Sequence, residues 1–426
     1  MRLSLIILLC LTYLGSAAAS TAPTTSPTTA PTTVPSAGRN VVLWINLDGV
    51  RGDYIDRAKP PTLTKLMNDG AYSRELVPVF PSLTFPSHAT LATGVTVSGH
   101  GIPGNSYYDT EDGETYSFPA DYKFLRAEAI WETATRQGIR VSVVDWPLSH
   151  RQTGEHKSAF FGPYFDGSLS DEQRLQMAIT PMMLDNGSPP LQLIMGYASK
   201  IDTVGHSKGP DAEETLAELN RVDEVLADVI KQAQRRFDTQ MEENDNLYVI
   251  ITTDHGMSKV ETNVNVDRML GPTWSKEITT VTSSSLAIIY LDKLPETERT
   301  ARRDAIIEHV KQYDFVNAFT REQAREKYGF DDPSRVGELI LSLDKSYTFN
   351  RSQKVEVMTP VSKGSGLGMH GYDPAENSEM LGFMVIWRYR GSLGGIDLGR
   401  VDSKQLHPTV ARLLGIEPAK GVTAEA

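Results

Sequence analysis

The chain has 426 residues, of which 40% are hydrophobic, and its formal net charge is −12. This length and composition allow a large buried core, either in one α/β domain or in two lobes. The negative charge argues against non-specific binding to a nucleic-acid backbone or to an anionic membrane. If the protein acts on phosphate esters, it needs a local source of positive charge, and a bound metal ion is the simplest one.

The first 19 residues have the three parts of a secretory signal peptide. Arg2 supplies the positive charge, "LIILLCLTYLG" the apolar stretch and "SAAAS" a cleavage region of small residues. The apolar stretch is too short to predict a membrane span, although an uncleaved anchor stays the alternative. Cys10 is the single cysteine and lies in this segment, so the mature chain has no disulfide. We therefore expect an exported protein, periplasmic or secreted, of bacterial origin.

Residues 20–38, "STAPTTSPTTAPTTVPSAG", repeat Pro-Thr-Thr at four-residue spacing. Such a low-complexity segment cannot bury a core, and we expect an extended tether that carries no chemistry. The folded catalytic domain is expected over residues 39–420.

Strand-like and helix-like patterns alternate beyond the tether. "NVVLWINLD" is a nearly continuous apolar run, as are "VSVVDW", "LQLIMGY" and "NLYVIITTD". Such runs are typical of parallel strands that are covered on both faces. Residues 211–231 show the apolar period of a helix. The alternation predicts an α/β fold whose central, mostly parallel sheet has helices on both faces. Residues 104–190 are irregular and predict a loop-rich insertion over the active-site end of the sheet.

Acidic residues and histidines stand where these strand-like runs end, which is where α/β sheets bind ligands. They occur in the strings "LDGVRGD", "DTVGHSKGP", "TTDHGM" and "GMHGYD", as Asp48, Asp202, His206, Asp254, His255 and His370. Taken singly, such residues are more often turn residues, helix caps or loop histidines. Together, three aspartates and three histidines suit two divalent ions such as zinc, which is a recurring device for phosphoryl transfer.

The ordered set of motifs resembles the nucleotide pyrophosphatase/phosphodiesterase family of the alkaline phosphatase superfamily, in its compact bacterial form. The motifs are "LDGVR", "PSLTFPSH", "GHGIPGN", "DTVGHSKGP", "TTDHGM" and "GMHGYD", within residues 40–418. The resemblance implies an alkaline-phosphatase-like fold and a hydrolase of phosphodiester and phosphoanhydride bonds of nucleotides, which releases nucleoside 5′-monophosphates. The chain departs from the usual family pattern in "SKID" and "HGYDP", and neither change touches a proposed ligand.

The resemblance also implies two Zn²⁺ ions as cofactors. It assigns one ion to Asp202, His206 and His370, and the other to Asp48, Asp254 and His255. Thr84 would bridge toward this second ion and attack phosphorus through a threonine-linked intermediate. Asn105 would donate to a non-bridging phosphate oxygen, and Phe85 and Tyr164 would sandwich the nucleobase.

Thr84, in "TFPSHATLAT", taken by itself is more often a helix cap than a nucleophile. A threonine hydroxyl needs a base or a metal ion to become an attacking alkoxide. Pro86 stands where helix starts favour proline, and amides at a helix N-terminus can face phosphate oxygens. The two readings are therefore compatible. We expect His88 to be structural, and Arg51 to form a salt bridge rather than a phosphate contact.

Other activities fit the same residues less well. A phosphomonoesterase or a phosphonoacetate hydrolase needs no pair of aromatic residues to hold a nucleobase, as Phe85 and Tyr164 would. A choline-type phosphodiesterase differs in its substrate alone. The absence of a cysteine in the mature chain that could be converted to formylglycine argues against a sulfatase. A silent binding protein would be expected to have lost a ligand or the nucleophile. We expect a small nucleotide-like phosphodiester as the partner, with no nucleic-acid-binding domain, no membrane span after signal cleavage and no obligate protein partner.

Overall fold

The computed structural model describes residues 38–162, 164–240, 242, 244–351, 356–362 and 366–426. The predicted signal peptide and all of the predicted tether except Gly38 lie outside the described residues. Residues Gly38–Ala426 form one compact unit. In the part of the chain that the structure describes, no helix has the length and apolar character needed to cross a membrane.

The central sheet is mostly parallel, as predicted. Within the described residues it has nine strands, in the order β18 (Ile396–Asp397), β2 (Ala71–Val77), β17 (Gly382–Arg388), β8 (Asn246–Thr252), β1 (Asn40–Leu47), β7 (Leu193–Ala198), β5 (Val141–Val143) and β6 (Phe160–Phe161), with β19 (Arg400–Asp402) paired to β2. Strand β1 is parallel to both of its neighbours, β7 and β8. Strand β17 is antiparallel to both β8 and β2. The β1 strand therefore lies at the centre of the sheet, and its carboxyl end is flanked by those of β7 and β8.

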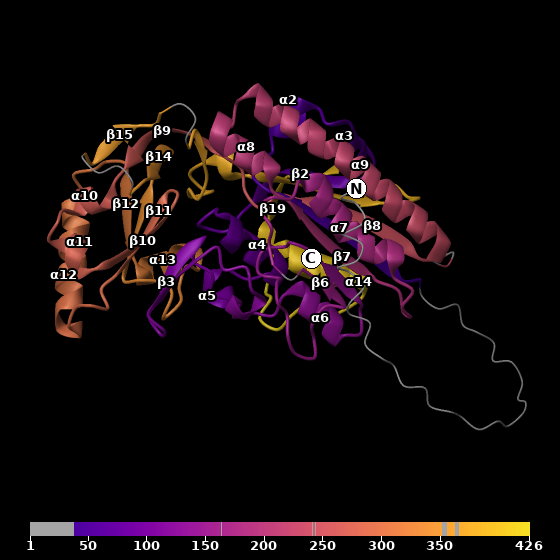
Figure 1. Cartoon of the computed structure of the whole chain (residues 1–426), viewed down its shortest axis with the longest axis horizontal. Helices are drawn as coiled ribbons and strands as arrows, with labels where there is room; N and C mark the ends of the chain where they lie inside the picture. Colours follow the sequence, from indigo (N-terminus) through magenta and orange to yellow (C-terminus); the bar gives the residue numbers. More distant parts are fainter. Residues whose placement is uncertain (1–37, 163, 241, 243, 352–355, 363–365) are drawn as a thin grey trace, which may run out of the picture. The chain divides into compact units, whose positions relative to one another are not determined.

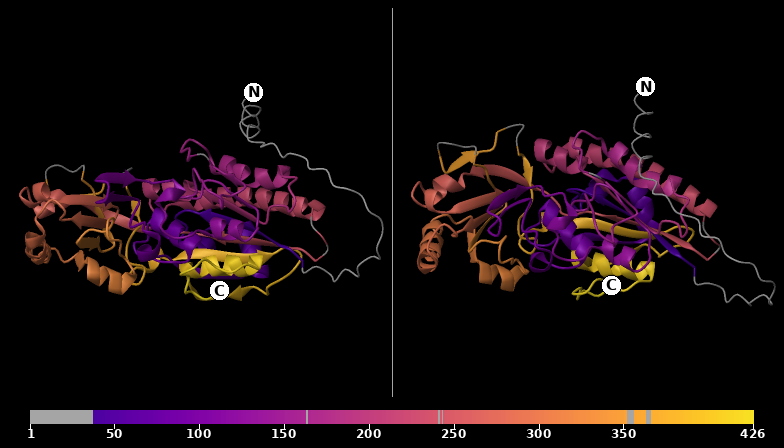
Figure 2. Two further views of the ribbon diagram at one scale, coloured as in Figure 1. Left: turned by 90° about the horizontal axis from the view of Figure 1, so that it is seen from below. Right: turned by 60° about the horizontal axis from the view of Figure 1, so that its bottom comes forward.

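Helices cover both faces of this sheet because β1 alternates its buried side chains between two cores. Val41, Leu43 and Ile45 pack into one core, and Val42 and Trp44 into the other. The first core includes residues of α3 (Pro61–Asp69), α7 (Asp171–Leu184) and α9 (Glu213–Gln240). The second includes residues of α4 (Thr84–Thr93), α6 (Ile130–Arg136) and α14 (Leu406–Leu414). Figure 2 shows α9 and α14 on opposite faces, which confirms the predicted α/β architecture.

A second, antiparallel sheet was not anticipated from the sequence. Its order is β10 (Thr279–Ser283), β11 (Leu286–Tyr290), β13 (Leu339–Leu343) and β12 (Val316–Thr320). It has a core of its own, which takes in residues of α10 (Val266–Leu270) and α12 (Glu296–Val310) (Figure 1). A smaller sheet joins β9 (Ser258–Val264) to β14 (Ser346–Phe349), β15 (Met358–Pro360) and β16 (Gly368–Met369). Because β9 pairs with β16, this small sheet brings the segment that carries His370 back to the end of β8.

The segment 104–190 is only partly loop-rich. It begins with the hairpin of β3 (Ser106–Asp109) and β4 (Glu114–Ser117), but it also supplies β5, β6 and α7 to the main layers. The short helices α2 (Tyr54–Ala58), α5 (Val97–His100), α8 (Lys200–Lys208), α11 (Trp274–Glu277) and α13 (Arg321–Tyr328) connect the larger elements.

Candidate active site

Two sequence motifs, "LDGVRGD" and "TTDHGM", begin at the last residues of two neighbouring parallel strands. Strand β1 ends at Leu47 and is followed at once by Asp48, while β8 ends at Thr252, two residues before Asp254. Because these strands are parallel, their carboxyl ends meet at one edge of the sheet. The ligand atoms of Asp48, Asp254 and His255 all lie within 4.8 Å of one another. All three side chains are buried, and we call them the buried group.

Asp202, His206 and His370 form a second group, whose ligand atoms are also within 4.8 Å of one another. We call them the outer group, because Asp202 and His206 are only partly buried. We expected Asp202 and His206 on a strand-end loop, but they lie on helix α8. Spacing of four residues places both side chains on one helix face, so Asp202 Oδ2 is 3.3 Å from His206 Nε2. His370, which follows β16, places Nε2 3.6 Å from Asp202 Oδ1.

The two groups are in direct contact through stacked histidine rings. The rings of His255 and His370 have centroids 3.6 Å apart and an interplanar angle of 12°. Each ring belongs to a different group, so the six side chains form one continuous cluster. The structure thus brings together all six residues that the sequence singled out as metal-type ligands.

The three histidines share an orientation that is typical of metal ligands. Backbone carbonyl oxygens lie close to every Nδ1: that of Gly368 is 2.6 Å from His206, that of Gly256 is 2.9 Å from His255, and that of Ser82 is 3.1 Å from His370. A carbonyl can only accept, so each Nδ1 carries the hydrogen. In a neutral ring this leaves Nε2 with a free lone pair, and a carbonyl that accepts from Nδ1–H commonly fixes a metal-binding histidine in this way.

Several carboxylate oxygens of the cluster accept no hydrogen bond, although histidine nitrogens lie near them. Within the described residues, Oδ1 of Asp48, Oδ1 of Asp202 and Oδ2 of Asp254 are buried and accept no hydrogen bond. Buried acceptors are normally satisfied, so these oxygens indicate that something else supplies positive charge there. Nitrogen and oxygen donors in this number fit a divalent cation in each group, and imidazole with carboxylate is a donor set that zinc accepts.

The electrostatics of the cluster point the same way. Burial, together with repulsion from Asp254 and Asp202, raises the pKa of Asp48 well above its ordinary value. Burial also lowers the pKa of His370, to which His255 adds repulsion. Burial likewise opposes charge on His206, but the carboxylate of Asp202 outweighs it and raises the pKa of His206 to about 9. A cation would relieve the crowding of carboxylates in the buried group.

Thr84 begins α4 and its hydroxyl faces the buried group. Its Oγ1 lies 3.3 Å from His255 Nε2, and the residue is 8% exposed. The side chain of Thr84 caps no backbone amide of α4, since the N-cap position belongs to Leu83. Thr84 is therefore not the helix cap. Its hydroxyl instead lies beside the atoms that would hold a metal ion.

Asn105 and Phe85 meet across the same helix start. The amide N–H of Phe85 donates to Oδ1 of Asn105 at 2.9 Å, which leaves the side-chain NH₂ of Asn105 free to point elsewhere. Phe85 is buried against Ala89, Ile102 and Leu148. Asn105 is thus fixed next to the residue that follows Thr84, where its amide can donate to a bound anion.

Tyr164 lies in the loop between β6 and α7 and is 64% exposed. Other aromatic residues, which the sequence did not single out, contact residues of the site. Phe118 is 61% exposed, and its ring is 5.7 Å from that of Phe85. It has φ of +49°, an uncommon conformation for a bulky residue, and such outliers concentrate at functional sites. An aromatic residue that follows a hairpin near a glycine-rich motif is too common a signal to have identified it.

Tyr197 and Phe165 were also missed. The hydroxyl of Tyr197, on β7, donates to Oδ2 of Asp48. The ring of Phe165 lies 6.4 Å from that of Tyr197 and 4.1 Å from the guanidinium carbon of Arg174. Arg174 is buried and bonds to Asp145 at 2.6 Å. A tyrosine next to the last residue of the buried strand β7, which is parallel to β1, was the one available sequence signal, since its hydroxyl needs a partner there.

Arg51 forms a salt bridge, as expected from the sequence. Its Nε lies 2.6 Å from Oδ1 of Asp53, and its Nη2 lies 3.4 Å from Oδ1 of Asp211. Nη1 of Arg51 donates to the carbonyl of Met257 at 3.4 Å. Arg51 therefore joins the segment after β1, the loop after α8 and the segment after His255.

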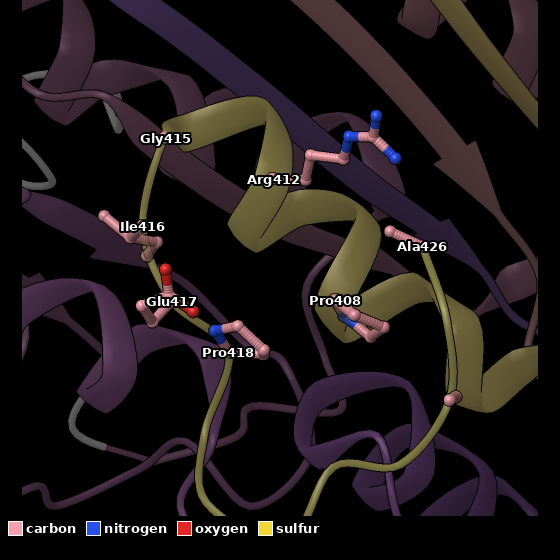
Figure 3. Close-up of a pocket in the computed structure, with 8 residues that line it drawn as sticks. Pro408, Arg412, Gly415, Ile416, Glu417, Pro418 and Ala426 are labelled. Carbon is pink, nitrogen blue, oxygen red and sulfur yellow. The ribbon is translucent and has the colours of Figure 1, made fainter.

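A hollow of about 400 Å³ lies elsewhere, beside α14 (Figure 3). It is lined by Pro408, Arg412, Gly415, Ile416, Glu417, Pro418, Ala424 and Ala426. The guanidinium of Arg412 points away from Glu417, so the polar side chains do not converge on one point (Figure 3). This hollow contains no residue of the Asp/His cluster, and it is not a competing catalytic site.

Comparison with known proteins agrees with this geometry. The profile of the family described as type I phosphodiesterase/nucleotide pyrophosphatase matches residues 42–373. The chain belongs to this family. Its homologues are named as nucleotide pyrophosphatases and phosphodiesterases, so the chain is a hydrolase of this type. The matched segment contains all ten residues that the resemblance singled out.

Two curated relatives and one solved structure illustrate the family. Human bis(5′-adenosyl)-triphosphatase ENPP4 is 27% identical over 384 residues, which cover 88% of this chain and 78% of the relative. An uncharacterised pyrophosphatase/phosphodiesterase of Schizosaccharomyces pombe is 31% identical over 370 residues, which cover 79% and 68%. Murine ectonucleotide pyrophosphatase/phosphodiesterase 5 has the same fold, with a TM-score of 0.75 at 24% identity over 89% of this chain and 96% of that one. That structure is an inactive threonine-to-alanine variant in complex with AMP.

Proposed function

We propose that the chain is a two-zinc hydrolase of the phosphodiester and phosphoanhydride bonds of nucleotides, which releases nucleoside 5′-monophosphates through a threonine-linked intermediate. The observation that carries the proposal is the position of the Thr84 hydroxyl, 3.3 Å from His255 Nε2, at the edge of two contiguous Asp/His groups. The outer group would hold one ion through Asp202, His206 and His370. The buried group would hold the other through Asp48, Asp254 and His255.

Each residue has a distinct part in this proposal. When bound, the ions supply Lewis acidity that lowers the pKa of a hydroxyl and neutralises charge on phosphoryl oxygens. Thr84 Oγ1 gives up its proton to solvent and forms a bond to phosphorus, while the bond from phosphorus to the leaving oxygen breaks and solvent protonates that oxygen. The NH₂ of Asn105 donates to a non-bridging oxygen as charge develops there. Water then breaks the bond between Thr84 and phosphorus, which regenerates the hydroxyl and releases the monophosphate.

Nucleotides are the favoured substrates because aromatic rings stand next to Thr84. Phe85 follows Thr84 directly and Phe118 packs against Phe85, while Tyr164 is exposed in the loop between β6 and α7. Stacking on aromatic rings holds any base with little preference for its identity. The name of the human relative, an adenosyl-triphosphatase, and the AMP complex of the murine one support the same substrate class. A phosphomonoesterase, a phosphonoacetate hydrolase or a choline-type diesterase is the alternative.

Esters of p-nitrophenol test the proposal directly. We expect p-nitrophenyl thymidine 5′-monophosphate to be cleaved faster than p-nitrophenyl phosphate and faster than p-nitrophenyl phosphorylcholine. A chelator should abolish the activity and Zn²⁺ should restore it. Faster cleavage of the monoester or of the choline ester would replace the nucleotide assignment by one of the alternatives. Full activity in protein free of metal by elemental analysis would end the two-zinc proposal.

We further propose that residues 39–420 are the catalytic domain and that the chain works outside the cytoplasm, after export by the predicted signal peptide. The name ectonucleotide pyrophosphatase/phosphodiesterase of the murine structure supports an extracytoplasmic site of action. Bacterial origin and a periplasmic address stay predictions from the sequence. Mass spectrometry of the secreted chain tests the export proposal, since it should show a new N-terminus near residue 20.

A further inference from the structure

His88 is a buried histidine that neither the metal ligands nor the proposed reaction steps include. It lies on α4, one helical turn after Thr84, and is 0% exposed. Its Nδ1 is 2.8 Å from the backbone carbonyl oxygen of Thr84. The same Nδ1 is 3.5 Å from Oδ2 of Asp254. One nitrogen of His88 therefore faces both the nucleophile's backbone and a member of the buried group.

The hydrogen on His88 can be placed from this geometry. The carbonyl of Thr84 can only accept, so Nδ1 carries the hydrogen and donates it. Nε2 of His88 is buried and has no hydrogen-bond partner among the described residues. All of the polar interaction of this ring with the site therefore runs through Nδ1. The positive end of the Nδ1–H bond also attracts the carboxylate of Asp254 in a buried setting.

Neighbouring aromatic rings prevent His88 from turning away. Trp146 meets the ring edge-on at 5.2 Å and 79°, and Tyr197 does so at 5.0 Å and 87°. Tyr197 in turn donates its hydroxyl to Oδ2 of Asp48. The ring thus contacts groups tied to Thr84, to Asp254 and, through Tyr197, to Asp48. A residue that only filled space would not need its polar atom at this junction.

We propose that His88 is a positioning residue, whose Nδ1–H holds the first turn of α4 against Asp254 and so fixes the Thr84 hydroxyl relative to the buried group. The proposal deepens the proposed function and rests on Thr84 being the nucleophile. It replaces the purely structural role that the sequence suggested for His88.

Two substitutions of His88, by asparagine and by glutamine, distinguish the role of Nδ1 from that of Nε2. The amide nitrogen of asparagine takes the place of Nδ1, whereas that of glutamine takes the place of Nε2. We expect H88N to keep kcat for p-nitrophenyl thymidine 5′-monophosphate within about fivefold of the parent chain. H88Q should lose about 10- to 100-fold in kcat with KM changed less than about threefold, since loss of a residue that orients a metal ligand typically has this effect.

Zinc binding supplies a readout without substrate. In metal-free protein titrated with Zn²⁺ against a chromophoric chelator, H88Q should bind one of two ions about tenfold or more weakly. H88N should match the parent chain. If the parent chain cleaves no nucleotide diester, the proposed function fails, while the titration still decides whether His88 supports the buried group. Equal affinity and equal kcat for H88N and H88Q would overturn the positioning role, and so would equal losses in both.

A buried histidine elsewhere provides the matched control. His407 is also 0% exposed, and its Nδ1 donates to the carbonyl of Ala92 at 2.7 Å. H407N and H407Q should alter thermal stability but should have the same zinc affinity as each other. If their zinc affinities differ as those of H88N and H88Q do, the difference arises from packing of the substituted side chain, and the proposal fails. Should neither His88 variant fold, a neutron structure of the unmodified chain decides. Deuterium on Nδ1 directed at the Thr84 carbonyl is expected, and deuterium on Nε2 alone would overturn the proposal.

Discussion

Gly49 leaves the space that Asp202 occupies. A Cβ on Gly49 would lie 2.9 Å from the Cβ of Asp202, closer than real contacts allow. Gly49 also has φ of +70°, which costs little in glycine alone. Its amide N–H donates to Oδ1 of Asp254 at 3.2 Å. One residue without a side chain therefore touches both the outer and the buried group, and it sets how closely they approach.

Substitution of Gly49 by alanine should damage both groups. The positive φ costs about 1–2 kcal/mol in any residue with a Cβ, and the added methyl pushes Asp202 away. We expect G49A to lose at least about tenfold in kcat and to bind fewer than two zinc ions. G138A is the control, because Gly138 has φ of +85° and nothing within 4 Å of an added Cβ. It should lose similar stability in urea unfolding and keep its activity. Equal activity in both variants would contradict the steric argument.

Removal of the Thr84 hydroxyl should abolish turnover and spare metal binding. We expect T84A to lower kcat by about 10³-fold or more, the scale on which removal of a nucleophile acts, while elemental analysis still finds about two zinc ions per chain. T84S retains a hydroxyl and should keep much more activity than T84A. Covalent capture of labelled nucleotide on acid quenching should occur in the parent chain and not in T84A. A T84A variant with near-normal turnover would exclude Thr84 as the nucleophile.

Removal of the ring of Phe85 or Phe118 should weaken the binding of substrates that carry a base. Base–aromatic stacking contributes about 1–3 kcal/mol per base, so F85A and F118A should raise KM for p-nitrophenyl thymidine 5′-monophosphate about five- to a hundredfold. Bis(p-nitrophenyl) phosphate, which has no base, should show a smaller change. Phe160, on β6 and 37% exposed, provides the control in F160A. The same KM change for both substrates would mean that Phe118 acts on the backbone or on packing rather than on the base.

Acid should destabilise the fold through His100, which lies apart from the Asp/His cluster. Burial lowers the pKa of His100 to about 3, from an ordinary value of 6.5. Between these two pH values His100 is protonated in the unfolded chain but neutral in the folded chain. The free energy of unfolding therefore falls as pH falls, by up to about 1.4 kcal/mol per pH unit. This contribution is complete above pH 6.5 and is lost as pH falls towards 3.

The H100Q variant tests how much the protonation of His100 contributes to this pH dependence. Glutamine can still meet the hydroxyl of Thr90, which lies 3.1 Å from His100 Nε2, but it cannot titrate. We expect the free energy of unfolding of H100Q, from urea titrations at pH 6, 5 and 4, to fall less steeply than that of the parent chain. Parallel slopes would show that His100 is protonated in the folded state.

The sequence by itself determined the local elements and the identity of the cluster. The apolar runs of β1, β7 and β8, and the helical period in α9, depend on short-range patterns that any fold must respect. The chemistry of aspartate and histidine also belongs to the residue types, so the six predicted metal-type side chains could be named before their positions were known. The ordered motifs then identified the family.

Only the tertiary structure decided how these parts meet. Contacts such as the stacking of His255 on His370, the space that Gly49 leaves for Asp202 and the bond from Tyr197 to Asp48 join residues far apart in the chain. No local pattern reports such contacts, because they depend on which strand ends lie side by side and on where a hairpin or a second sheet returns the chain. For the same physical reason, Phe118 and His88 read as ordinary aromatic and helical residues in the sequence, and gain their proposed roles from the neighbours that the fold gives them.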